Sequence, residues 1–239
     1  MAILSLQDVS KSFGALKVTD GVSFDLQPGE ALGIIGPNGA GKSTLFNLIT
    51  GNIAPNAGRV FLDGRDVTRA APMERVKAGI GRSFQIPQPF GNLSVYENLL
   101  VAARFGGAVP AAEAPRFCME ILIRTGLAPV AEKASGTLSL LQRKRLELAR
   151  AMATRPRVIL LDEIAGGLTD AECGQLVATI KAIHAEGTAI IWIEHVLHAL
   201  TSVVERLMVL NFGRMLMIGA PEEVMASPQV REIYLGIEA

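Results

Sequence analysis

Residues 31–44 read ALGIIGPNGAGKST. Residues 31–35 form an apolar run of the kind found in buried strands, and residues 36–44 fit the pattern G-x-x-x-x-G-K-[ST] that surrounds the phosphates of a nucleoside triphosphate. Glycines let the backbone of such a loop turn so that successive N–H groups point at phosphate oxygens. The segment therefore predicts a strand, a phosphate-binding loop and a helix from Lys42 to about Thr50.

The residues of this loop have distinct expected roles. Lys42 reaches the outer phosphates and takes part in catalysis, and the hydroxyl of Ser43 ligates Mg²⁺. The helix directs its positive N-terminal end toward the anion, and Gly51 is a stop signal after its last turn. The residues expected to bind the nucleotide are Gly36, Pro37, Asn38, Gly39, Ala40, Gly41, Lys42, Ser43 and Thr44.

The composition is that of a globular protein with a substantial core. The 239 residues suffice for one large domain, or for a domain with a small insert, and 49% of them are apolar. Lysine plus arginine number 23, as do aspartate plus glutamate, so no nucleic-acid partner is expected. No apolar stretch is long enough to cross a bilayer, and residues 1–5 lack the pattern of a signal peptide. We therefore expect a cytoplasmic chain that reaches a membrane only through a partner.

The two cysteines give no sign of metal chemistry. Cys118 and Cys173 are far apart in the sequence and lack the spacing of metal ligands. We expect both to be buried thiols in a reducing compartment.

Strand-like and helix-like patterns alternate along most of the chain, which favours a parallel sheet covered by helices. Residues 87–154 differ, because apolar positions there recur at helical spacing and Ser94 is a good N-cap. Residues 106–115 are expected to form a loop within this stretch. The other expected elements are strands at 3–9, 22–26, 59–64, 158–161 and 189–193, a helix at 171–186 and a hairpin about 211–213.

Two acidic residues follow the apolar run at 158–161. The carboxyl ends of strands in such sheets face the crevice where ligands bind, so Asp162 is expected to hold Mg²⁺, directly or through water. Glu163 is expected to orient or deprotonate the attacking water. Taken alone, an acidic pair that merely begins a solvated loop fits the pattern equally well.

Three further residues are candidates for the same site. His195 follows the strand-like run at 189–193 and is expected to contact the γ-phosphate or the attacking water, although a lone histidine in this place is more often structural. Gln85 precedes the helical stretch and is expected to touch Mg²⁺ or the water, which would link the nucleotide to the position of that stretch. Phe13 either stacks on the adenine or is one more core aromatic.

Taken together, these residues closely resemble the ATP-binding subunits of ABC transporters, over essentially the whole chain. The resemblance implies an α/β fold: a P-loop NTPase (RecA-like) parallel-sheet core with an N-terminal antiparallel β subdomain and a helical insert at about 87–154, in one ABC ATPase domain spanning 1–239. It implies ATP and Mg²⁺ as cofactors, with Ser139 and Gln142 of the signature segment binding nucleotide. The matching positions are Phe13 for the adenine, 36–44 for Walker A, Gln85 for the Q-loop, 138–142 for the signature, 162–163 for Walker B, 166–170 for the D-loop and His195 for the switch histidine.

Several stretches resemble the branched-chain (hydrophobic) amino-acid uptake family in particular. They include GRSFQ at 81–85, LSVYEN at 93–98 and KRLELAR at 144–150. The tail, with VLNFGR at 209–214, PEEV at 221–224 and YLG at 234–236, is similar to the LivG-like member of the two ATPases in that family. Members of the group also serve urea, amides and aromatic acids, so the resemblance leaves the solute open.

The signature departs from the L-S-G-G-Q pattern of the family. The chain keeps Ser139 and Gln142 but has Leu140 and Leu141 in place of both glycines. In the family this segment lies against the γ-phosphate held by the other subunit, so the leucines are expected to weaken that half of a composite site. Alternatively, Leu140 faces the chain's own core and the loop shifts slightly. Walker A and Glu163 are intact, which predicts one competent and one slow site when the chain pairs with a different ATPase.

The resemblance implies an ATPase that powers uptake of branched-chain amino acids or a related small solute. The expected partners are a second ABC ATPase subunit, identical or different, the transmembrane permease subunits and, indirectly, a solute-binding protein, with the chain on the inner face of the cell membrane. The helical insert would dock on the permease near residues 85–97. Two other functions stay open. One is a regulatory or structural subunit with weak or no hydrolysis of its own; the other is a soluble ABC ATPase of repair or translation, which usually has a second ATPase half or a long coiled-coil insert that this chain lacks.

Overall fold

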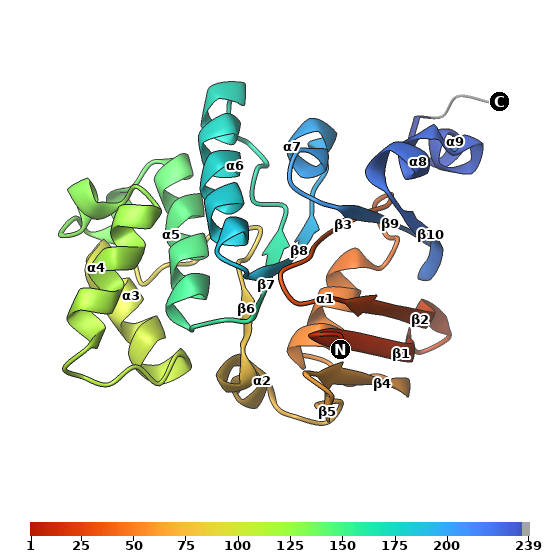
Figure 1. Ribbon diagram of the computed structural model, residues 1–239, viewed down its shortest axis with the longest axis horizontal. Coiled ribbons are helices and arrows are strands. Elements are labelled where there is room, and N and C mark those ends of the chain that lie inside the picture. Colours follow the sequence, from red (N-terminus) through yellow and green to blue (C-terminus); the bar gives the residue numbers. More distant parts are fainter. Residues whose placement is uncertain (236–239) are drawn as a thin grey trace.

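The computed structural model describes residues 1–235, which form two sheets with helices packed against and beside them (Figure 1). The larger sheet has six strands in the order β10-β9-β3-β8-β7-β6, and the smaller has four in the order β2-β1-β4-β5. The strands are β1 Leu4–Phe13, β2 Leu16–Leu26, β3 Ala31–Ile35, β4 Ala57–Leu62, β5 Arg65–Asp66, β6 Ile80–Arg82, β7 Val158–Asp162, β8 Ala189–Ile193, β9 Arg206–Asn211 and β10 Arg214–Gly219. The helices are α1 Lys42–Thr50, α2 Pro72–Ala78, α3 Val95–Val101, α4 Ala114–Arg124, α5 Leu140–Ala153, α6 Asp170–Ala185, α7 Leu197–Thr201, α8 Pro221–Ala226 and α9 Pro228–Leu235.

The centre of the large sheet is parallel, as the alternation of strands and helices predicts. β3 pairs with β8 and β9, and β7 pairs with β8 and β6, all in parallel, while β10 adds an antiparallel edge beside β9. Successive side chains of a strand point to opposite faces, and here both faces are covered. Ile159 and Leu161 lie in the core beneath α3–α6, whereas Val158 and Leu160 lie in the core shared with α1 and the small sheet. This two-sided burial explains why the strands read as continuous apolar runs.

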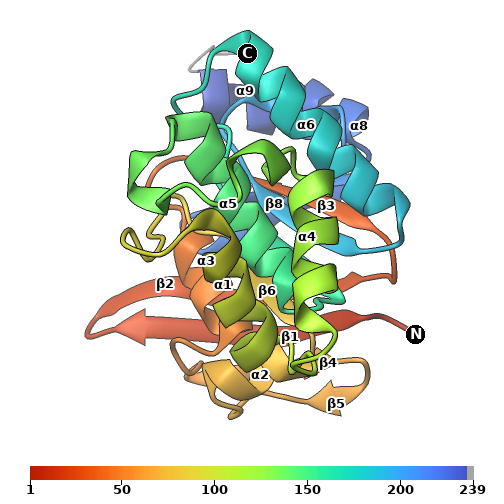
Figure 2. The ribbon, with the colours of Figure 1, turned by 90° about the vertical axis from the view of Figure 1, so that its left-hand side faces the viewer.

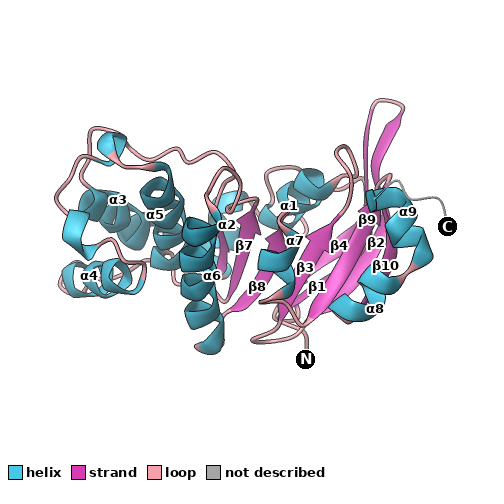
Figure 3. Ribbon diagram, turned by 90° about the horizontal axis from the view of Figure 1, so that it is seen from above, coloured by secondary structure: helices cyan, strands magenta, loops and turns pink. Residues whose placement is uncertain are grey.

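The small sheet is antiparallel and shares its core with α1 (Figure 3). Leu4 and Leu6 of β1 are buried in the same cluster as Leu45 and Phe46 of α1. The helix that follows the phosphate-binding loop is therefore packed between the two sheets. The predicted fold class, a P-loop NTPase core with an N-terminal antiparallel sheet and helical elements, is confirmed.

The helices α3, α4 and α5 gather at the end of the molecule remote from β10 (Figures 1 and 2). Ser94 caps α3 as predicted: its Oγ accepts a hydrogen bond from the N–H of Glu97 at 3.1 Å, and the Glu97 carboxylate accepts one from the N–H of Ser94 at 2.7 Å. The predicted loop at 106–115 is too long. A π-helical turn covers Ala102–Gly106, and α4 begins at Ala114, because Pro115 sits in a first turn that needs no N–H from it.

The elements without a sequence signal are short, namely α2, β5, β6 and α7–α9. Contacts with distant parts of the chain hold them in place. Arg75 of α2, for example, is 1% exposed and donates to the carbonyls of Leu48 and Ile49 at the end of α1. No helix within residues 1–235 combines the length and apolar character needed to span a bilayer. Gly236 of the tail motif lies outside the described residues.

We predict that the two thiols react with a thiol reagent only when the protein unfolds. Cys118 on α4 and Cys173 on α6 are free and buried. Burial raises the pKa of Cys118 to about 11 and also raises that of Cys173, so both remain protonated and unreactive at mildly alkaline pH. Mass spectrometry after alkylation, with and without denaturant, measures this. Rapid labelling of the native protein would contradict the described packing.

Candidate nucleotide-binding and catalytic site

The loop after β3 is shaped by contacts that only glycine allows. A Cβ on Gly36 would lie 2.2 Å from the carbonyl oxygen of Leu210, and one on Gly41 would lie 2.4 Å from that of Val18. Gly41 also has a φ of 100°, in the left-handed region that favours glycine. Helix α1 then begins at Lys42, and Gly51 follows its last residue, as predicted. The loop is thus a narrow backbone cradle at the N-terminal end of a helix.

A cavity of about 210 Å³ opens over this cradle. Its lining consists of Val18, residues 38–44 and Glu163. Lys42 is 6% exposed, and its ammonium group donates to the carbonyls of Gly36 at 2.7 Å and Pro37 at 3.1 Å. Burial lowers the pKa of Lys42, and the carboxylates of Glu163 and Asp162 oppose that shift. The loop backbone, the helix end and the buried lysine together suit the polyanion of a nucleoside triphosphate.

Glu163 is the centre of a hydrogen-bond cluster beside this cavity. It follows directly after β7, and its φ of 46° is uncommon for a residue that carries a side chain. Its Oε1 lies 2.8 Å from Nε2 of His195, and its Oε2 accepts a hydrogen bond from the side-chain amide of Gln85. The structure therefore brings together three of the residues to which sequence analysis gave catalytic roles, from the segments after β6, β7 and β8.

Asp162, the last residue of β7, forms an ion pair that the sequence did not reveal. Its Oδ2 lies 2.7 Å from a guanidinium nitrogen of Arg82, and the two side chains are 8% and 10% exposed. The other end of the guanidinium donates to Oδ1 of Asn47 on α1 at 2.7 Å. Arg82 stands 80 positions before Asp162 in the chain, so no local pattern relates the two residues.

Lys144 is the second site residue that sequence reasoning missed. It is 4% exposed on α5, and its ammonium group donates to the carbonyl of Gln85 at 2.7 Å and lies 3.3 Å from that of Glu163. Burial lowers its pKa, against the opposing effect of nearby carboxylates. A signal did exist, because Lys144 shares the apolar face of α5 with Leu141 and Leu148 at spacings of three and four residues.

Phe13 lies at the end of β1 and is 51% exposed, so it is not a core aromatic. The ammonium group of Lys11 lies 5.4 Å from the centre of its ring. Within the described part of the chain, Val18 lines the cavity over the phosphate loop and Phe13 does not. The stacking of Phe13 on adenine stays a prediction.

The signature segment opens α5, as the resemblance implies. Ser139 is the N-cap: its Oγ accepts from the N–H of Gln142 at 3.3 Å, and Oε1 of Gln142 accepts from the N–H of Ser139 at 3.1 Å. Leu141 is 9% exposed, but Leu140 is 44% exposed, so the alternative in which Leu140 faces the chain's own core is wrong. A Cβ on Gly167 of the D-loop would lie 3.3 Å from Leu140 Cδ2. The structure does not bring Ser139 and Gln142 to the lining of the chain's own cavity.

The residues present suit Mg²⁺ bound together with a nucleotide. Mg²⁺ usually takes one or two carboxylates, waters and phosphate oxygens, rather than a cage of protein ligands. Ser43 is exposed in the first turn of α1, and Asp162 is the buried carboxylate at the end of β7. Residues 1–235 hold no cluster of three or more histidine, cysteine or acidic side chains that would form such a cage.

Three features define a P-loop ATPase: a glycine-rich phosphate-binding loop after β3, a buried lysine in the first turn of the next helix, and an acidic pair at the end of β7, which is separated from β3 by β8. The sequence pattern of ABC transporters matches residues 19–166, and the chain belongs to this family as an ATP-binding protein. It is accordingly an ATPase of the ABC family.

Relatives and solved structures match nearly the whole chain. The chain is 34% identical to a probable branched-chain amino acid transport ATP-binding protein LivG of Methanocaldococcus jannaschii, covering 99% of this chain and 98% of that one. It is 32% identical to a lipopolysaccharide export system ATP-binding protein LptB of Acidithiobacillus ferridurans, covering 98% and 97%. Among solved structures it is similar to the ADP conformation of an ATP-binding cassette of an ABC transporter, with a TM-score of 0.88, 33% identity and coverage of 99% and 100%. It is also similar to a dimeric post-hydrolysis cassette bound to ADP and phosphate, with a TM-score of 0.81, 25% identity and coverage of 91% and 98%.

We predict that replacing Lys144 with methionine slows ATP hydrolysis roughly tenfold or more while leaving ATP affinity close to that of the wild type. The substitution keeps the apolar stem but leaves the carbonyls of Gln85 and Glu163 without their donor, so the side chain of Glu163, for which we expect a catalytic role, loses its position. ATPase rates and equilibrium nucleotide binding measure the two effects. Lys181→Met, at an exposed site on α6, is the matched control. An unchanged rate in Lys144→Met would contradict this role.

Proposed function

We propose that the chain hydrolyses ATP to power uptake of branched-chain amino acids or a related small solute through separate permease subunits. The observation that carries the proposal is the position of Glu163, which contacts Gln85 and His195 beside the phosphate loop. This arrangement suits a carboxylate that holds an attacking water. Uptake, rather than export, is supported by the sequence stretches shared with the amino-acid uptake family and by the LivG relatives.

In this proposal each motif residue has a mechanical task. The loop at 36–44 holds the phosphates through backbone N–H groups, with Lys42 at the outer ones. Ser43 and Asp162 hold Mg²⁺, which neutralises charge on the phosphates when it is bound. Glu163 orients the water and accepts its proton, His195 and Gln85 keep that carboxylate in place, and Phe13 stacks on the adenine.

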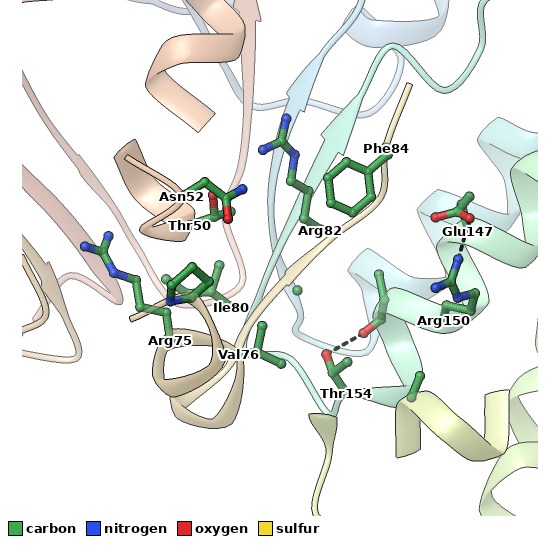
Figure 4. Close-up of a pocket in the computed structure, with 14 residues that line it drawn as sticks. Thr50, Asn52, Arg75, Val76, Ile80, Arg82, Phe84, Glu147, Arg150 and Thr154 are labelled. Atoms are coloured by element: carbon green, nitrogen blue, oxygen red, sulfur yellow. Dashed lines mark hydrogen bonds and ion pairs between the residues drawn. The ribbon is translucent and has the colours of Figure 1, made fainter. Parts of the chain in front are cut away.

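A second cavity, of about 260 Å³, suits a short segment of a permease (Figure 4). It lies between α2, β6 and α5, and Phe84, Glu147 and Arg150 are among the residues that line it. Phe84, Ile86 and Phe90 are 48%, 69% and 49% exposed on the segment that leads from Gln85 toward α3. An apolar surface of this extent beside the catalytic glutamine suits a membrane partner that must sense the nucleotide. We therefore assign docking of the permease to this cleft and to the helical insert at about 87–154.

Hydrolysis and transport test the proposal together. Glu163→Gln is expected to retain ATP binding but to lose at least about a hundredfold in ATPase rate, because the amide cannot accept a proton. Glu186→Gln, which removes an exposed ion pair on the far end of α6, is expected to behave as wild type. With its permeases and solute-binding protein in vesicles, the wild-type chain is expected to drive uptake of labelled leucine.

Two results would contradict the proposal. Full ATPase activity in Glu163→Gln would remove the catalytic assignment. ATP-driven extraction of a lipid from the vesicles, without solute uptake, would favour the function named for the LptB relatives instead.

The exposed Leu140 favours a second possibility for the complex, in which this chain contributes one competent and one slow site. Its signature presents an apolar side chain where an anion of the other subunit would lie, while its own Walker motifs are intact. In a heterodimer with an ATPase that carries a full signature, we predict that Glu163→Gln lowers turnover at least about tenfold more than the matching change in the partner.

Leu140→Gly in the same complex tests whether the leucine causes this asymmetry. The substitution removes the exposed side chain and is expected to raise turnover at the slow site. Equal losses from the two glutamate substitutions, or no response to Leu140→Gly, would show that the leucines do not limit hydrolysis.

A further inference from the structure

Arg82 connects the nucleotide site with the cleft of Figure 4. It is the last residue of β6, next to β7 in the large sheet. One end of its guanidinium pairs with Asp162, and the other donates to Asn47 on α1. Arg82 itself also lines the cleft. A single side chain therefore touches the Mg²⁺-side carboxylate, the helix of the phosphate loop and the surface to which we assign permease docking.

Two aromatic rings lie within cation–π distance of this guanidinium. Its central carbon lies 5.5 Å from the ring centre of Phe46, inside the core, and 4.9 Å from that of Phe84, in the wall of the cleft (Figure 4). Phe84 is 48% exposed, so an occupant of the cleft would touch its ring directly. Phe84 also stands next to Gln85, which contacts Glu163.

The contacts of Arg82 select one orientation for Asp162. Arg82 pairs with Oδ2 of Asp162, so the other oxygen of that carboxylate, Oδ1, is the one that would face a bound metal ion. Groups that hydrogen-bond to a metal ligand set its orientation, and their loss usually weakens metal binding. The planar fork of arginine bridges Asp162 and Asn47 at the same time, whereas the single ammonium group of lysine has no such geometry.

We propose that Arg82 is a positioning residue that holds Asp162 for Mg²⁺ and transmits occupancy of the cleft to that carboxylate through Phe84. This connection is separate from the contact of Gln85 with Glu163. Arg82 acts on Asp162, the residue proposed to hold Mg²⁺, whereas Gln85 acts on Glu163, the residue proposed to hold the attacking water. The second half of the inference rests on the proposed docking of a permease in the cleft. The first half rests only on the geometry of this chain.

The first experiment measures how much Mg²⁺ the isolated chain needs to bind ATP tightly. All variants carry Glu163→Gln, so that a fluorescent ATP analogue binds without being hydrolysed. Mg²⁺ is expected to increase the affinity for the analogue. Arg82→Gln and Arg82→Lys are expected to raise the Mg²⁺ concentration at half of that increase by roughly tenfold, with little change in affinity for the analogue in EDTA. Asn47→Ala removes only the hydrogen bond between Arg82 and α1, and it is expected to give a smaller shift in the same direction. This variant keeps the proposal testable if the Arg82 variants fold poorly.

The control is Arg157→Gln, which removes the same charge at an exposed ion pair with Asp63 and is expected to keep the wild-type Mg²⁺ requirement. A merely structural role for Arg82 would lower the thermal midpoint and the affinity in EDTA without shifting the Mg²⁺ requirement. That outcome, or an unchanged requirement in both Arg82 variants, overturns the positioning role.

The second experiment adds the permease subunits in vesicles. The Mg²⁺ requirement of the wild-type complex is expected to differ from that of the isolated chain, and in Phe84→Leu this difference is expected to vanish. A difference that persists in Phe84→Leu, or none in the wild type, overturns the transmission through Phe84. The first experiment needs no permease, so a chain that binds Mg²⁺ and ATP normally but drives no transport contradicts the proposed function and not the role of Arg82.

Discussion

The order of the parallel strands determines which loops meet at the catalytic edge. Because β6, β7 and β8 are adjacent and run in the same direction, the segments that follow them end side by side. Those segments supply Gln85, Asp162 with Glu163, and His195, while β3 on the other side of β8 supplies the phosphate loop. Residues separated by more than a hundred positions thus reach one carboxylate without any long side chain spanning the sheet. A break in the pairing of β7 with either neighbour would separate the water-side groups from the phosphates.

The parts of this site that the sequence predicted are those that depend on local pattern. The phosphate loop, the bounds of α1 and the strand before Asp162 are each specified by a short run of residue types with a direct physical reason. The site roles of Arg82 and Lys144 could not be predicted, because their partners come from other strands and helices. A single charged side chain in a short strand or on an apolar helix face does not by itself indicate a site. The short helix α2 was not predicted for the same reason, because its position depends on the hydrogen bonds of Arg75 with the end of α1.

The capping box of α5 changes how the altered signature is understood. Ser139 and Gln142 satisfy each other's backbone N–H groups, so the start of α5 is stable without an anion. Two leucines are compatible with this cap, because one of them, Leu141, is buried in the core of the helices. The other, Leu140, is left on the surface beside the D-loop glycine Gly167. Leucine at these two positions is therefore compatible with the stability of the single chain. Any effect of Leu140 is expected in the contact between its exposed face and a second subunit.

Charge balance explains why nucleotide and metal should arrive together. Lys42, Lys144 and Asp162 are buried, and Arg82 and Glu163 are partly buried. Burial lowers the pKa of each lysine, and nearby carboxylates oppose the shift: those of Glu163 and Asp162 for Lys42, and for Lys144 also that of Glu194, a buried residue just after β8. Without a ligand these side chains already compensate one another. A triphosphate adds several negative charges to a region of low dielectric, which loop N–H groups and Lys42 offset only in part. A divalent cation beside Asp162 supplies the rest, and because Arg82 already shares that carboxylate, its position bears on how readily the cation can bind.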